Sequence, residues 1–399
     1  VSTHDDVFDN IGHVSPRDLY NVQGTLSGPV PGTSGILKFL MSGKYINDDG
    51  YIYGRRMFKP DDYSNFSAND PDDWIVNATG DNEYVPMNYS RRASLQGKLY
   101  VKVGNAKWLV LQGMYQDRDY RDYDHNYKLN PDGDYSRFQT GFLGTASYTH
   151  VFSPSTFMDI KASSFTTESQ RYVYEDPLDP RYVPQDFKRF VGANAFLTAG
   201  TENWHFRHKT RTLTGKIDLT SQITNAHQLK SGIEAQMHRL EYEDFQVQVT
   251  PVLDPSTGQF VGYEHSLPTP GAFNYNTYQN NPYQLAAYLQ DKIELDYLIV
   301  NVGVRFDYFE PDARTLRDPN NIAVLDELQP PFPDSLMETA SAKYQFSPRI
   351  GLSYPMSDRG AIHVSYGHFF QVPAFEFLYR NPNFRIPLTG DYPEFVGST

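Results

Sequence analysis

The residues with the most obvious potential for chemistry are tyrosines that crowd into a few polar stretches of the chain. Aromatic rings beside Asp, Asn and Arg suit the binding of sugars or chelates, because the ring offers an apolar surface and its neighbours offer hydrogen bonds. Tyrosine is also common wherever one end of a ring is apolar and the other is wet. The candidate substrate contacts are Tyr120, Tyr123, Tyr127, Tyr172, Tyr174, Tyr275 and Tyr278.

An acidic cluster accompanies the first of these stretches. It comprises Asp117, Asp119, Asp122 and Asp124, with Asp132 and Asp134 nearby. Carboxylates are hard oxygen ligands that suit Ca²⁺, but the spacing is not that of an EF-hand. Arg118 and Arg121 interleave with the cluster and are expected to pair with its carboxylates. We therefore interpret the cluster as a solvated loop and predict no metal site.

Two histidines, His205 and His208, lie close to Trp204 but lack the adjacent third ligand that a zinc site requires. We interpret them as surface histidines. No strand–turn–helix nucleophile elbow is present, and a chain without Cys has neither disulfides nor thiolate metal sites. The sequence therefore predicts no catalytic residue, no enzyme activity and no cofactor.

The elements that must position these residues are β-strands, because apolar and polar residues alternate with a period of two. In residues 94–103, Leu95, Leu99 and Val101 fall on one face, and Lys98 and Lys102 fall on the other. Residues 212–220 and 298–307 repeat the pattern. Weaker copies bring the total to twelve expected strands and cover residues 21–27, 36–46, 107–116, 138–152, 156–167, 228–241, 283–294, 345–354 and 361–370.

The connections between these strands alternate strictly between short and long. The short ones, rich in turn-forming residues, are 30–35, 104–106, 153–155, 224–227, 295–297 and 355–360. The long ones are 47–89, 117–137, 168–208, 242–282 and 309–343. In an up-and-down meander this alternation places every short turn at one end of the sheet and every long loop at the other.

Such asymmetry is typical of bacterial outer-membrane barrels, which have short periplasmic turns and long outer loops. Hydrocarbon offers no hydrogen-bond partners, so a sheet spans it only when the sheet closes on itself. The sequence thus predicts an all-β, transmembrane, antiparallel up-and-down β-barrel in the outer membrane. Leu95, Leu99 and Val101 would face lipid. The residues expected to line the interior are Lys98, Lys102, Lys216, Asp218, Glu234, Arg305 and Arg349.

Composition agrees with this interpretation but excludes other classes. The formal net charge of −13 argues against nucleic-acid binding, which needs clustered Lys and Arg. A mean hydropathy of −0.57 excludes membrane-spanning helices. A soluble sandwich or propeller remains open, since its core-facing strands also alternate. Asp291 on an apolar face, Pro348 within a strand and the ambiguous faces of residues 107–116 stand against the barrel.

Both ends of the chain are expected on the long-loop side. Because such barrels usually start and finish at the short-turn side, residues 1–20 and 371–399 are interpreted as incomplete extracellular loops. At least one further strand is then expected before residue 21 and one after Phe370. Residues 1–399 would form part of a single barrel domain.

Five strings of the sequence resemble the TonB-dependent receptors, specifically the large type with a carboxypeptidase-regulatory-like N-terminal domain. They are NVQGTLSGP at 21–29, YLQDKIE at 288–294, NVGVRFDY at 301–308, SPRIGLSYP at 347–355 and SYGHFFQVP at 365–373. Asp291 and Pro348 lie inside two of these strings, which weakens the objections that they raise.

The resemblance implies a 22-stranded barrel, of which twelve strands are present, closed by an N-terminal plug that is absent from this sequence. It implies import of a bulky nutrient such as a glycan, peptide or metal chelate, driven by the TonB complex through a segment that is also absent. The interior cations would then grip the plug. Implied partners are the outer-membrane bilayer, the TonB complex and a surface lipoprotein, and no nucleic acid. A passive porin-like barrel, a barrel enzyme and a soluble secreted β-propeller or sandwich binding protein remain alternatives.

Overall fold

Twelve long strands form one continuous antiparallel sheet in a computed structural model of the chain, with the short strand β17 (Tyr275–Asn280) paired to the end of one of them. The structure describes residues 18–379, apart from 186, 187, 190–194, 270, 271, 273, 319–333 and 358. The expectations for residues 1–17 and 380–399 fall outside this part of the chain. Each long strand pairs with the next in sequence, so the all-β, antiparallel, up-and-down prediction is confirmed.

All twelve expected strands are present, and several are longer than the alternation predicted. Their bounds are β1 (Leu19–Pro29), β2 (Leu37–Asp48), β7 (Ser90–Gly104), β8 (Lys107–Tyr120), β9 (Ser136–Ser153), β10 (Thr156–Tyr172), β13 (Trp204–Gln222), β14 (His227–Gln246), β18 (Tyr283–Leu295), β19 (Leu298–Glu310), β22 (Lys343–Ser357) and β23 (Gly360–Gly367). The longest extensions lie at the long-loop end, so that positions 205, 208, 117 and 119 belong to strands rather than loops.

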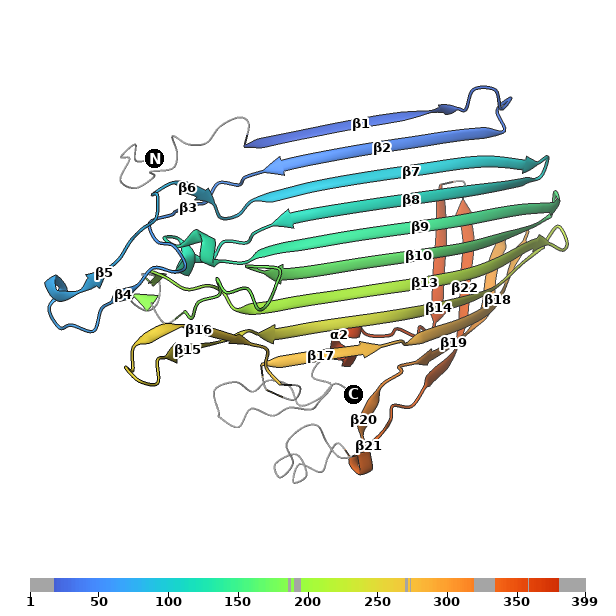
Figure 1. The fold of residues 1–399 in the computed structure, drawn as a ribbon. Helices are drawn as coiled ribbons and strands as arrows, with labels where there is room; N and C mark the ends of the chain where they lie inside the picture. Colours follow the sequence, from blue (N-terminus) through green and yellow to red (C-terminus); the bar gives the residue numbers. More distant parts are fainter. Residues whose placement is uncertain are drawn as a thin grey trace.

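The tight turns gather at one end of the sheet and the long connections at the other, as Figure 1 shows. The long connections carry small elements of their own: β3 (Tyr53–Arg55) with β6 (Tyr84–Pro86), β4 (Ser64–Asn65) with β5 (Ile75–Val76), η2 (Pro71–Asp73), η3 (His125–Tyr127), η4 (Pro131–Gly133), β11 (Lys188–Arg189) with β12 (Phe196–Leu197), β15 (Gln248–Leu253) with β16 (Phe260–Ser266), and β20 (Arg314–Leu316) with β21 (Met337–Thr339) after η6 (Asp334–Leu336).

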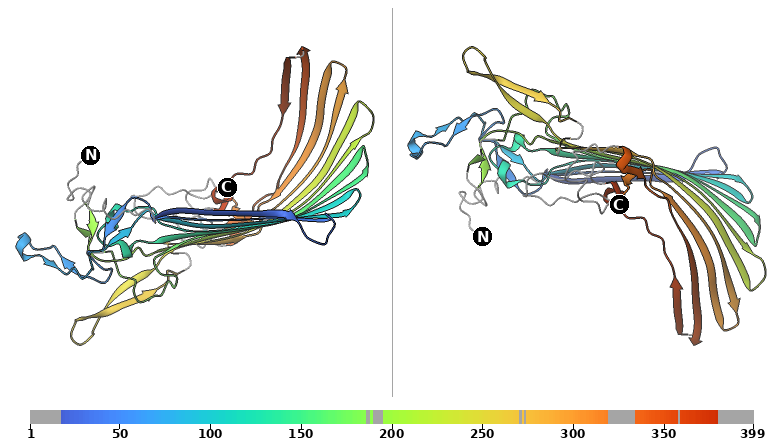
Figure 2. Two further views of the ribbon diagram at one scale, coloured as in Figure 1. Left: turned by 90° about the horizontal axis from the view of Figure 1, so that it is seen from above. Right: turned by 90° about the horizontal axis from the view of Figure 1, so that it is seen from below.

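The sheet is bent into an arc, and the chain after β23 crosses its concave side to reach the short helix α2 (Phe375–Tyr379) (Figure 2). Strands β1 and β23 form the two edges, each paired on one side within the described residues. Among the described helices, none has the length and apolar character needed to cross a membrane.

The register assigns every side chain of the sheet to one of two faces, because directly opposed residues of an antiparallel pair lie on the same face. Leu99 lies opposite Phe39 and Leu111, whereas Lys98 lies opposite Leu40 and Gln112. The pairing therefore settles the ambiguous faces of residues 107–116: Leu109 and Leu111 join the apolar face, and Gln112 joins the polar one.

The polar face is the concave one. Phe375 of α2, which lies on the concave side, packs its ring against His238 at 4.7 Å, and Tyr379 of α2 belongs to a buried cluster with Leu240. His238 and Leu240 share their face with Glu234, since residues two apart on a strand point the same way. Residues such as Lys98 and Glu234 thus face inward, and the apolar side chains face outward.

The convex face is apolar and exposed. Leu95 is 61% exposed and Ile233 is 58% exposed, with comparable values along the other strands. Uncovered apolar surface on this scale marks contact with a partner or a membrane. Asp291, the carboxylate that alternation placed on this face, is paired there with His227, whose Nδ1 lies 2.7 Å from Asp291 Oδ2. This hydrogen-bonded contact gives Asp291 a polar partner and removes one objection to a lipid-facing surface.

Candidate functional site on the concave face

All seven charged residues that were expected to line the interior share the concave face. Lys216 lies directly opposite Glu234, which lies opposite Ala286, and Ala286 lies opposite Asp307. Arg305 and Arg349 follow on the same face through the next pairings, and Lys98 and Lys102 reach it through β8, β9 and β10. The period of two was therefore a sufficient signal to group these residues.

Charges in the middle of this face neutralise one another. Lys216 Nζ lies 3.2 Å from Asp218 Oδ2, and the Tyr288 hydroxyl donates to Asp218 Oδ1 at 2.7 Å. Arg305 Nε lies 2.8 Å from Asp307 Oδ1. Glu234, Arg305 and Arg349 come together around a cavity of about 280 Å³. Such a polar, internally paired wall suits a water-filled interior.

Basic side chains nevertheless outnumber acidic ones on the concave face, although the whole chain carries a net charge of −13. The basic residues that the register places there are Lys38, Lys44, Arg92, Lys98, Lys102, Arg118, Arg137, Lys161, Arg171, Lys216, Lys230, Lys292, Arg305, Lys343 and Arg349, and the acidic ones are Asp48, Asp159, Asp218, Glu234, Asp244, Glu294 and Asp307. The acidic balance of the sequence therefore comes from the loops and the outer side of the strands.

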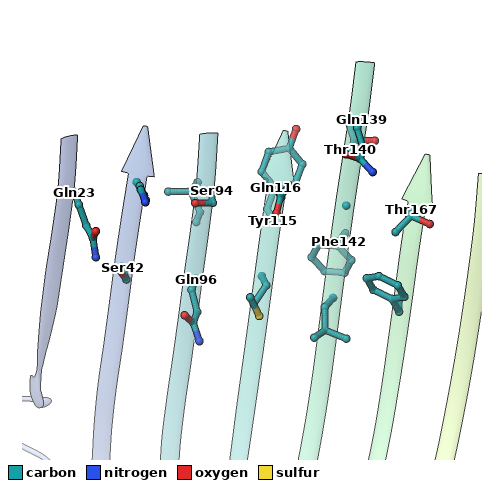
Figure 3. Close-up of a pocket in the computed structure, with 16 residues that line it drawn as sticks. Gln23, Ser42, Ser94, Gln96, Tyr115, Gln116, Gln139, Thr140, Phe142 and Thr167 are labelled. Carbon is teal, nitrogen blue, oxygen red and sulfur yellow. The ribbon is translucent and has the colours of Figure 1, made fainter. Parts of the chain in front are cut away.

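An area with many amide and hydroxyl groups and a single charged side chain, Lys44, lies on the concave side of the first strands. Figure 3 shows amide and hydroxyl side chains from neighbouring strands around a cavity of about 430 Å³, among them Gln23, Ser94, Gln96, Gln116 and Gln139. Amides and hydroxyls both donate and accept hydrogen bonds. This area can form hydrogen bonds with a hydrated solute or with another protein surface.

The candidate substrate tyrosines do not form one site. Tyr120, opposite Ser90 and Arg137, and Tyr278, opposite Tyr242, are on the concave face. Tyr278 is only 9% exposed, because it stacks on Tyr242 with ring centroids 5.0 Å apart and packs against Tyr379. Of this pair, Tyr120 is the one whose ring remains half-exposed.

The other five candidate tyrosines lie either on the convex face of the sheet or in the long loops. Tyr172 stacks on His205 and Tyr275 packs against Phe245, and both contacts are on the convex side of the extended strands. Tyr123 and Tyr174 lie in loops, and Tyr127 is 2% exposed in a cluster with Met87 and Leu197. The alternation of apolar and polar residues could not predict these positions. The face on which Tyr172 lies depends on β10 continuing beyond its alternating part, to Tyr172 itself.

The interpretation of His205 as a surface residue is wrong. Its side chain is 7% exposed, stacks on Phe245 and lies 2.7 Å through Nε2 from the hydroxyl of Tyr182. His205 therefore anchors the connection between β10 and β13 to the end of the sheet. His208 is half-buried and lies on the concave face opposite Tyr242.

The acidic cluster is split between strand and loop. Asp119 accepts a hydrogen bond from the Tyr89 hydroxyl, Asp122 pairs with Arg137 at 2.6 Å, and Asp124 caps η3 through Asn126 N–H. The expected pairing of Arg118 and Arg121 with these carboxylates is wrong: Arg118 Nε donates to Ser90 Oγ, and Arg121 donates to the carbonyl of Pro131. The described residues contain no group of three or more His, Asp or Glu positioned to hold a metal ion.

A third cavity, of about 610 Å³, opens at the loop end between β17, the chain after β19 and the segment before α2. Its wall mixes aromatic and apolar side chains with Arg314, Glu338 and Lys343. Sequence reasoning missed this cavity, because residues 371–379 return to the concave side only through tertiary packing. Its size is within the range of small-ligand sites.

This sequence and this architecture are similar to those of known proteins. The family model described as "TonB dependent receptor-like, beta-barrel" matches residues 42–393. Among solved structures, the FrpB iron transporter of Neisseria meningitidis is 14% identical, with a TM-score of 0.50 over 88% of this chain and 43% of that one. The ferripyoverdine receptor of Pseudomonas aeruginosa is 13% identical, with a TM-score of 0.52 over 88% and 40%.

A third solved structure, the ferric yersiniabactin uptake receptor FyuA of Yersinia pestis, is 13% identical, with a TM-score of 0.51 over 88% of this chain and 44% of that one. At this identity the likeness shows the fold alone. The chain spans less than half the length of each of these three structures. No curated protein matches the sequence.

Proposed function

The chain belongs to the TonB-dependent receptor β-barrel family, and we propose that it supplies part of the wall of an active transporter that imports a bulky nutrient. Proteins with this barrel are bacterial outer-membrane proteins, and so is this one. The family comprises receptors and transporters rather than enzymes. Energy would come from the TonB complex, acting through a plug that the barrel encloses.

The observation that carries the proposal is the two-faced sheet. Outside the charged extensions at the long-loop end, its convex side chains are mostly apolar and uncovered, and its concave side chains are mostly polar and partly paired. A soluble sandwich would cover the apolar face with a second layer. An apolar outer face with a polar interior is the arrangement of a transmembrane barrel.

We propose that residues 1–399 belong to a single barrel domain whose remaining wall and plug complete the transporter. Unpaired strand edges are not tolerated in hydrocarbon, so β1 and β23 are expected to be paired in the membrane. The interior cations, Lys98 and Lys216 among them, would contact the plug. No feature of the described residues favours a surface lipoprotein as a partner of this barrel.

The proposed nutrient is a glycan, a peptide or a metal chelate. The names of three structural neighbours mention iron, ferripyoverdine and ferric yersiniabactin. Fold similarity at 13–14% identity does not carry such cargo from one protein to another.

Uptake by cells with and without TonB tests the proposal. A receptor-deletion strain and its complemented parent are grown on panels of glycans, peptides and ferric chelates, and a nutrient that needs the receptor is identified. Initial uptake of that nutrient is then measured after deletion of tonB. We expect uptake to fall at least about tenfold, because the energy source is removed.

A passive pore is the competing account. The full-length protein, reconstituted in liposomes, should not admit small sugars if a plug closes it. Receptor-dependent uptake that persists without TonB, together with swelling of those liposomes in small sugars, would instead establish a porin.

A further inference from the structure

Four arginines lie side by side at the loop end of the concave face, one on each of four consecutive strands. Arg92 of β7 is directly opposite Arg118 of β8, and Arg137 of β9 is directly opposite Arg171 of β10. Arg118 lies opposite Gln139, two residues from Arg137, which is a diagonal neighbour within reach of a long side chain. We call these four residues the arginine row.

Carboxylates of the described residues balance only part of the positive charge of the arginine row. Like charges placed directly opposite each other destabilise a sheet. Arg137 pairs with Asp122, and Arg171 Nη2 lies 3.7 Å from Asp244. No ion pair among the described residues involves Arg92 or Arg118, and the buried Nε atoms of Arg92 and Arg171 have no hydrogen-bond partner there.

The neighbouring position on the other face shows the contrast. Arg91, one residue away on the convex side, lies within 3.7 Å of Asp49 and 4.0 Å of Asp119. Carboxylates near this end of the strands thus pair with Arg91 on the outside of the sheet and, through Asp122, with Arg137 on the inside, but not with Arg92 or Arg118. The two adjacent guanidinium groups of Arg92 and Arg118 on the inside have no counter-charge within the part of the chain that the structure describes.

Tyrosine rings hold the guanidinium groups in place. The guanidinium carbon of Arg118 lies 3.9 Å from the centre of the Tyr120 ring. The ring of Tyr135 lies 5.0 Å from Arg137 and 4.9 Å from Arg171. Stacking of this kind orients a planar guanidinium while leaving its N–H groups free to donate.

We propose that the arginine row, with Tyr120, binds the anionic groups of the imported solute. The guanidinium fork matches a carboxylate or a phosphate with two parallel hydrogen bonds, so either group could supply the charge. The row lies at the long-loop end of β7–β10, where a solute entering from outside first meets the concave wall. The inference rests on the proposed function and narrows it to an anionic substrate.

Binding of defined anions to the full-length receptor, purified from outer membranes in detergent, tests the inference. Citrate serves as the carboxylate probe and inorganic pyrophosphate as the phosphate probe, each titrated calorimetrically at low and at moderate salt. We expect wild-type binding to one or both probes that weakens with salt. In the double variant Arg92→Gln/Arg118→Gln we expect Kd to rise at least about tenfold, because charge-assisted bidentate bonds are lost.

Two controls accompany the double variant. Arg91→Gln removes a charge from the same strand on the opposite face and should leave Kd within about twofold of wild type. Arg92→Lys/Arg118→Lys keeps the charge but loses the fork, and should bind with intermediate affinity. Heat-modifiable electrophoretic mobility establishes that each variant forms its barrel.

Two results would overturn the inference. One is the absence of citrate and pyrophosphate binding to the wild-type receptor. The other is equal binding by the folded Arg92→Gln/Arg118→Gln variant. Either result leaves the proposed function standing as long as uptake still depends on TonB, whereas loss of that dependence would refute the proposed function whatever the anions do.

Discussion

Asp134 is a carboxyl group buried inside the outer loops without a full set of partners. It is 3% exposed, and its Oδ2 has no hydrogen-bond partner among the described residues. Arg121 lies nearby but donates to the backbone oxygen of Asp134 at 3.2 Å. Burial raises the pKa of Asp134 to about 7, against the opposing charge of Arg121.

This raised pKa predicts that the loop loosens as the pH rises. An unfolded Asp has a pKa of about 3.9, so the folded loop holds its proton more tightly than the unfolded loop does. The loop is therefore most stable below about pH 4 and loses stability progressively up to about pH 7. Hydrogen exchange of residues 121–135, corrected for intrinsic rates, should show at least about tenfold less protection at pH 8 than at pH 5.

Asp134→Asn is the matched variant, since an amide of the same shape does not titrate. Its protection should change little between the two pH values. Equal protection of the wild-type loop at pH 5 and pH 8 would show that Asp134 is not held in its neutral form.

At the scale of single residues, the sequence predicted the composition of the inner face but not its most specific feature. Alternation alone grouped Lys98, Lys216 and Arg305, because a face needs only the period of two. The arginine row depends on the register between paired strands, such as Arg92 opposite Arg118 in the β7–β8 hairpin, and alternation along a single strand does not fix that register. The burial of His205 likewise depends on contacts with Tyr182 and Phe245, which no local pattern encodes.

At the scale of elements, strand existence and order were predictable, but strand ends were not. The apolar face ends where lipid ends, whereas the backbone ladder continues. In β13 the alternation predicted residues 212–220, and the strand runs Trp204–Gln222. Its extension pairs with the end of β14, and there Arg207 and Lys209 pair with Glu168 on the convex side.

Strand β7 offers a direct test of the two faces. Leu99 lies between Phe39 and Leu111 on the convex face, and the adjacent Lys98 faces inward. Leu99→Arg should cost about 2–4 kcal/mol in folding free energy, because the charge enters the bilayer centre, whereas Lys98→Gln should be mild. Denaturant titration of the full-length protein refolded into lipid vesicles measures both. Equal costs at the two positions would remove the assignment of faces.

At the scale of the whole molecule, the twelve-stranded arc explains why an acidic, hydrophilic sequence belongs in a membrane. Only one side chain in two needs to be apolar, and the long loops lower the mean hydropathy further. The apolar side chains form most of the convex surface, and the polar side chains, among which basic residues outnumber acidic ones, form most of the concave surface. Net charge and hydropathy averaged over the chain conceal this division, which appears only when residues are sorted by face.

The central claim is that the convex face contacts lipid while the concave face contacts water, and site-directed spin labelling along β13 tests it most directly. The chain contains no Cys, so each introduced Cys is the only labelling site within these residues. Labels are placed in turn at positions 213 to 219 of the full-length protein in lipid vesicles, and collision with oxygen and with a water-soluble nickel chelate is measured. Labels replacing Leu213, Gly215, Ile217 and Leu219 should favour oxygen, and labels replacing Thr214, Lys216 and Asp218 should favour the chelate. Uniform accessibility to the chelate along all seven positions would contradict a transmembrane barrel wall.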